Sequence, residues 1–152
     1  MTQVGLSAKK WPPPGFPLVQ GDYALTETWI IHLPEEFARR VEDGQLVLWR
    51  PGLTFWLAVW GNDNNETQAA RLAWMKDEAN PARSDARESV GGGVTRFSYR
   101  LRDESEDGPV ESLNACVIAA DEHLQMSAYF DDVADAAKAQ QIVDGVTVRR
   151  QA

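Results

Sequence analysis

Residues 45–60 read QLVLWRPGLTFWLAVW, and this stretch decides the fold because its pattern predicts a β-hairpin. Two apolar, strand-like runs flank Arg50-Pro51-Gly52-Leu53. Proline presets φ at the first central position of a turn, and glycine accepts the positive φ of the second. We therefore expect the chain to reverse here.

The turn sets the register of the two strands. It places Leu48 opposite Phe55 and Leu46 opposite Leu57, so one face of the hairpin is wholly apolar. An apolar face of this size must be buried in the core.

The second face of the hairpin is mixed. Trp49 is expected opposite Thr54 and Trp56 opposite Val47, and Trp60 ends the strand. What covers these three tryptophans is the main functional question that the sequence raises.

Composition narrows the class of protein. A chain of 152 residues that is 43% hydrophobic can form one domain with a sizeable core. Its net charge of -8 repels nucleic-acid phosphates and anionic membrane surfaces, so neither is an expected partner. No run approaches the ~20 apolar residues of a transmembrane helix, and the N-terminus lacks the continuous apolar stretch of a signal peptide. We expect a cytoplasmic protein.

Periodicity predicts the other elements. Residues 1–20 are rich in proline and indicate a flexible arm, and residues 21–152 indicate a single domain. Strands are expected at 28–33, 45–50, 53–60, 94–102, 110–120 and 123–130, a short helix at 34–40, and principal helices at 68–80 and 132–144. Residues 81–93, with three consecutive glycines, indicate a mobile loop. The fold class is therefore α+β, with a single antiparallel sheet of five to six strands built from hairpins and two principal helices.

Turn and cap residues refine this prediction. Ala119 is expected opposite Leu124 in the last hairpin. Asn65 and Gln68 resemble a capping arrangement for the first principal helix, whereas Asp131 or Asp132 begins the second and Gly145 ends it. The expected core is Leu46, Leu48, Phe55, Leu57, Phe97, Tyr99, Leu101, Leu124, Met126 and Phe130.

Motifs for chemistry are weak. No nucleophile signature accompanies the two histidines, and Cys116 excludes an intramolecular disulfide and is typical of a small buried residue. Residues 62–66 look like a calcium loop, but Gln68 stands where glycine belongs and Trp74 where the bidentate glutamate belongs. We predict no metal and no cofactor.

Two segments resemble a known family. Trp29-Ile30-Ile31-His32-Leu33-Pro34 is similar to an early strand ending in proline, and Tyr129-Phe130-Asp131-Asp132 leads into the last helix. Together with the order of elements, they resemble the Mog1/PsbP-like α/β fold. The Val47-Leu48-Trp49-Arg50-Pro51-Gly52 turn resembles one in small bacterial proteins. The resemblance implies the fold, and it implies no functional residue.

One set of residues is the candidate binding face. If the predicted registers hold, the following project from one sheet face: His32, Trp49, Trp56, Trp60, Arg96, Arg100, Arg102, Gln125 and Tyr129. Tryptophan, tyrosine and arginine dominate interface hot spots, so this face predicts a non-enzymatic module that binds a protein partner. Two alternatives stay open. Helix 68–80 can cover the tryptophans as ordinary core, or a pocket around His32, Arg96 and Tyr129 can hold a small molecule or perform catalysis.

Overall fold

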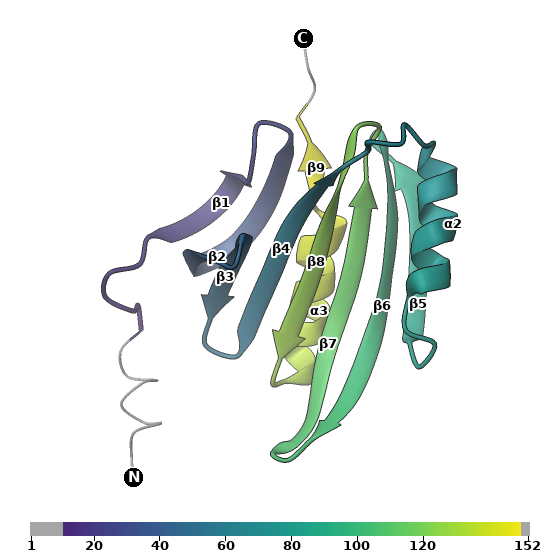
Figure 1. Cartoon of the computed structure of the whole chain (residues 1–152). Helices are drawn as coiled ribbons and strands as arrows, with labels where there is room; N and C mark the ends of the chain where they lie inside the picture. Colours follow the sequence, from purple (N-terminus) through teal and green to yellow (C-terminus); the bar gives the residue numbers. More distant parts are fainter. Residues whose placement is uncertain (1–10, 150–152) are drawn as a thin grey trace.

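The computed structural model describes residues 11–149, which form one large sheet and two helices (Figure 1). The helices are α2 (Gln68–Glu78) and α3 (Val133–Asp144). The strands are β1 (Leu18–Ala24), β2 (Trp29–Glu42), β3 (Gln45–Arg50), β4 (Leu53–Gly61), β5 (Ser84–Gly91), β6 (Val94–Ser105), β7 (Gly108–Ile118), β8 (Glu122–Phe130) and β9 (Thr147–Val148). Within these residues no helix is long and apolar enough to cross a membrane.

The strands form a single antiparallel sheet in the order β1-β2-β3-β4-β8-β7-β6-β5, and β9 pairs with β2. The predicted α+β class is therefore confirmed. The sheet has nine strands rather than five to six, because β1, β5 and β9 were not expected.

The β3–β4 hairpin has the predicted register. Leu48 pairs with Phe55, and Leu46 pairs with Leu57. Gly52 has φ 84°, as the second central position of a type II turn requires.

The predicted helix at 34–40 is wrong, because these residues continue β2. Gly21 pairs with Leu33 and Val19 with Phe37, so residues 34–36 bulge opposite a single β1 residue. Such a bulge tolerates a proline inside a strand. Phe37 then enters the core, where it contacts Phe55 with ring centroids 6.1 Å apart. The burial of Phe37 outweighs the helix-starting preference of Pro34.

Both segments expected to be flexible contain a strand. Residues 18–20 of the predicted 1–20 arm belong to β1, and Phe16 packs edge-to-face on Trp49 with centroids 5.0 Å apart. Residues 1–10 lie outside the described residues. In the predicted loop 81–93, β5 pairs with β6 around Gly92 and Gly93, whose φ values of 62° and 82° suit a tight hairpin turn.

Helix α3 covers one sheet face, here called the α3 face, and lies behind the sheet in Figure 1. Asp132 caps its start by accepting the backbone N–H of Ala134 at 2.9 Å, and the helix ends before Gly145, as predicted. Its buried residues are Ala136, Ala139, Ile142 and Val143. They pack against β2, β7 and β8, and the core continues through the inward-facing apolar residues of β2, β4, β7 and β8.

Helix α2 lies on the opposite face, against β6 and β7. Its N-cap is Thr67, whose hydroxyl accepts from Ala70 N at 3.0 Å, and not the expected Asn65. Strand alternation puts Phe97 and Tyr99 under α2, so they do not join the α3 core as predicted. A second, smaller apolar layer therefore exists on this face.

The β7–β8 register differs from the prediction by two residues. Val117, not Ala119, pairs with Leu124. Because side chains alternate with a period of two, this shift leaves every predicted side chain on its predicted face.

Replacing Phe55 with alanine should lower the free energy of unfolding by about 3–5 kcal/mol, because a fully buried ring leaves a cavity. Urea titration measures this loss. Val90→Ala is the control because the Val90 side chain is exposed, and it should change stability little. Equal midpoints for Phe55→Ala and wild type would contradict the core described here.

Asp135 should make stability depend on pH. Arg50 donates to Asp135 at 2.6 Å and holds the pKa of that carboxyl below its ordinary value of 3.8. A lowered folded pKa means that the contribution is present above 3.8 and is lost as pH falls through the folded value. Asp135→Asn should cost about 1–3 kcal/mol at pH 7.

The loss should shrink as the pH falls below 3.8. Chemical denaturation between pH 2.5 and 7 would measure it, with Asp131→Asn as the matched control. A pH-independent difference would show that the ion pair does not stabilise α3 in this way.

Candidate functional site

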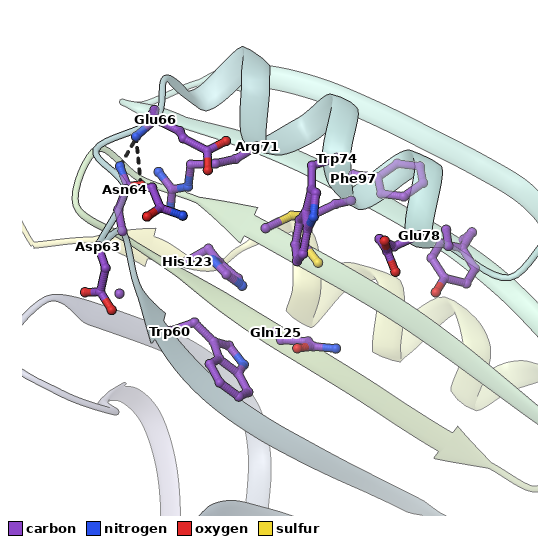
Figure 2. Close-up of a pocket in the computed structure, with 16 residues that line it drawn as sticks. Trp60, Asp63, Asn64, Glu66, Arg71, Trp74, Glu78, Phe97, His123 and Gln125 are labelled. Atoms are coloured by element: carbon purple, nitrogen blue, oxygen red, sulfur yellow. Dashed lines mark hydrogen bonds between the residues drawn. The ribbon is translucent and has the colours of Figure 1, made fainter.

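A cleft of about 490 Å³ opens between α2 and the adjoining ends of β4 and β8 (Figure 2). We call it the α2 cleft. Its lining includes Trp60, Asp63, Glu66, Arg71, Trp74, Glu78, Phe97, Cys116, His123 and Gln125.

Two tryptophans line the α2 cleft from different elements. Trp60 ends β4 and Trp74 lies on α2, and their exposed fractions are 55% and 56%. Trp74 follows Arg71 by three residues and precedes Glu78 by four, so all three share one helix face. An exposed indole is costly to hydrate, and two beside one cleft indicate a contact surface.

The floor of the α2 cleft is a row of side chains across three strands. Phe97 pairs with Cys116, and Cys116 pairs with Gln125. The register of β6, β7 and β8 therefore brings an aromatic ring, a thiol and an amide side by side in the floor of the α2 cleft.

Arg71 fixes α2 to the sheet. It is 5% exposed and donates through Nη1 to the carbonyl oxygens of Ala119 at 2.5 Å and Ala120 at 3.3 Å. Burial lowers the pKa of Arg71, and the carboxylates of Glu66 and Asp121 oppose this shift. Nη2 is buried without a hydrogen-bond partner within residues 11–149.

The loop before α2 is held in place by Asn62. Its amide donates to the carbonyls of Glu66 at 2.9 Å and Ala120 at 3.0 Å, and its oxygen accepts from Glu66 N at 3.0 Å. Figure 2 shows Asp63 and Glu66 at this end of the cleft and Glu78 at the other. Both ends therefore carry carboxylates on an ordered backbone.

The polar groups of the floor are neutral near pH 7. Burial, with the positive charge of Arg71, lowers the pKa of His123 below 6.5. Burial raises the pKa of the Cys116 thiol to about 11. Neither group is arranged as an activated nucleophile. Within residues 11–149 no group of three or more His, Cys, Asp or Glu side chains could hold a metal ion.

Trp49, Trp56 and Trp60 lie on one face of the sheet. Helix α2 packs on the same face but against β6 and β7, whereas these tryptophans belong to β3 and β4. Arg40 stacks between Trp49 and Trp56, at 4.7 Å and 5.8 Å from the ring centroids. Phe16 covers part of Trp49. Among the predicted tryptophans, only Trp60 lines the α2 cleft.

The predicted arginines lie on the other face. Arg96 donates to the carbonyl of Val146, and Arg100 lies 4.9 Å from the Phe130 ring and bonds Glu111 at 3.0 Å. Arg102, on the same side of β6, lies within 4 Å of Glu104 and Glu111. The error arose because Phe97 and Tyr99 were assigned to the α3 core, which sent the arginines to the tryptophan face.

The predicted pocket around His32, Arg96 and Tyr129 does not form. Arg96 faces α3, whereas Tyr129 is on the α2 side of the sheet and lines a separate cavity of about 370 Å³. His32 contacts Asp22 at 2.5 Å and Thr147 Oγ1 at 3.2 Å. This order matches an acid-histidine-hydroxyl triad, but Asp22 is 78% exposed and the cavities described above do not contain it.

Sequence reasoning missed Trp74, Glu78 and Arg71 as cleft residues. The available signal was their spacing on one face of helix 68–80.

Comparison with known proteins finds similar folds among solved structures. No family model and no curated protein matches the chain. The structure is similar to a crystal structure from Bacteroides thetaiotaomicron, with a TM-score of 0.67 and 12% sequence identity over 88% of this chain. This chain spans 50% of that protein, and at such low identity the likeness shows the fold alone.

A crystal structure of LpqN, involved in cell envelope biogenesis of Mycobacterium tuberculosis, is also similar. Its TM-score is 0.46 and its identity 12%, over 91% of this chain and 87% of LpqN.

Cys116 should react slowly. At pH 8 a thiol with a pKa of about 11 has a thiolate fraction about a hundredfold below that of one at 9.0, so alkylation should be slowed at least in that proportion. Timed iodoacetamide labelling followed by mass spectrometry measures the rate, with urea-unfolded protein as the control. Equal rates for folded and unfolded protein would contradict a buried thiol in the cleft floor.

Proposed function

We propose that this protein is a non-enzymatic binding module and that the α2 cleft holds a short segment of a partner protein. The observation that carries the proposal is the placement of Trp60 and Trp74 on one cleft while both are more than half exposed. Tryptophan is the residue type most enriched among interface hot spots, and a partner that covers both rings buries the apolar surface that they expose to solvent.

The surface beside the cleft supports a partner larger than a metabolite. Trp56 precedes Trp60 by four residues on the same face of β4, and Tyr129 lies on that face in β8 with 42% exposure. Next to Trp56, the Ser127 hydroxyl donates to the Asn114 side-chain oxygen at 3.0 Å, and these two side chains form a polar strip on the same face. A segment anchored in the cleft can continue across this strip, which fits a shallow protein interface.

A small-molecule ligand is the second candidate. The volume of about 490 Å³ lies within the range of ligand pockets and favours it. Enzymatic activity gains less support, because the cleft pairs no base with a nucleophile. A Mog1/PsbP-like classification and a cytoplasmic location are also proposed. An antiparallel sheet followed by a C-terminal helix supports the first, and the single cysteine, which suits a reducing compartment, supports the second.

Affinity purification from the organism of origin tests the proposal. We expect the tagged wild type to retain a defined protein that the Trp60→Ser/Trp74→Ser double variant loses. The matched control is Val90→Ser/Val133→Ser, which removes two exposed apolar side chains elsewhere and should retain it.

A parallel thermal-shift screen against metabolites separates the two candidates. A metabolite shift that needs Trp60 and Trp74, without a protein partner, would support the small-molecule function instead. Partner retention that is unaffected by the tryptophan double variant would contradict the α2 cleft as the binding site.

A further inference from the structure

We infer that the segment bound by the α2 cleft is basic, with one large apolar side chain between two lysine or arginine residues. The inference rests on the proposed function and adds the chemistry of the partner. It is drawn from the charges, the aromatic rings and the length of the cleft.

The charge around the α2 cleft is negative at both ends. Asp63 and Glu66 stand at one end and Glu78 at the other, and all three are exposed (Figure 2). Glu78 lies in the last turn of α2, where the helix dipole disfavours an acidic side chain, so helix stability does not explain it. These carboxylates are placed to meet cations.

The cation in the lining, Arg71, offsets only part of the charge of the three carboxylates. Arg71 is 5% exposed, and its Nη1 points to the carbonyls of Ala119 and Ala120. The carboxylates of Glu66 and Asp121 act on the same guanidinium. With a chain charge of -8, the cleft favours a positively charged segment and repels an acidic one.

The middle of the cleft is apolar and aromatic. Trp74 and Met75 come from α2, and Phe97 from the floor. An aliphatic or aromatic anchor fits this part of the cleft. The exposed faces of Trp60 and Trp74 also accept lysine or arginine through cation–π contact, so the rings and the carboxylates select the same partner.

The length of α2 sets the spacing of the basic residues. From Thr67 to Glu78 the helix rises roughly 16 Å at 1.5 Å per residue. An extended peptide advances about 3.3 Å per residue and points successive side chains to opposite sides, so two cations that reach both ends from the same side stand about four or six positions apart. The apolar anchor lies between them.

Selection from a random dodecapeptide library on the immobilised full chain tests the inference. Peptides are counted only if the Trp60→Ser/Trp74→Ser variant fails to hold them. We expect these to carry lysine or arginine about four or six positions apart around a large apolar residue. A synthetic consensus peptide should bind the Glu66→Gln/Glu78→Gln variant about three- to tenfold more weakly than wild type at low salt.

The matched control is Glu106→Gln/Asp107→Asn in the β6–β7 turn, which removes the same charge elsewhere and should leave the affinity unchanged. Raising the salt concentration should weaken binding to wild type more than to the Glu66/Glu78 variant.

Tryptophan-dependent peptides that are acidic or uncharged would overturn the inference, whereas the proposal of a binding module would remain. If the selected peptides were acidic, Nη2 of Arg71, which has no hydrogen-bond partner within residues 11–149, would be the group that binds their carboxylates. A library without any tryptophan-dependent peptide would count against the proposed function itself.

Discussion

The pairing of β4 with β8 is the constraint on which the rest of the structure depends. It runs without a bulge from Leu53 opposite Phe130 to Gly61 opposite Glu122 and joins the two hairpins into one sheet. Because side chains alternate, this one register sends the apolar residues of both strands toward α3 and places Trp60 beside His123 on the other face. A slip by one residue would exchange the two faces, so the core and the cleft are set together.

The second face stays partly open because α2 runs along the strands and covers only two of them (Figure 1). Eight strands side by side span roughly 34 Å at about 4.8 Å between neighbours, whereas a helix with its side chains is only about 10–12 Å across. Helix α2 lies over β6 and β7, and Phe16 packs on Trp49 toward the other edge. The α2 cleft lies where the helix stops covering the sheet. Its acidic rim and its exposed tryptophans follow from that boundary.

Local patterns predicted the elements whose signals are local. The Pro51-Gly52 turn, the α3 cap at Asp132 and the apolar face of β8 were correct because the turn, the cap and the alternation each act within a few residues. Strand β5 was missed because its residues are all exposed and mostly polar, so that only its pairing with β6 identifies it as a strand. For the site, Trp60 was predicted from its strand, whereas Arg96 and Arg100 were misplaced because face assignment in β6 depends on which helix covers it. Trp74 required knowledge of where α2 docks.

Hydroxyl-radical footprinting with mass spectrometry tests most directly whether the cleft between Trp60 and Trp74 is open. The structure predicts rapid oxidation of both rings, slower oxidation of the half-buried Trp49 and Trp56, and protection of Trp29, which is fully buried. If Trp60 or Trp74 were as protected as Trp29 in the free protein, the cleft would be closed. The account of this face as a binding site would then be contradicted.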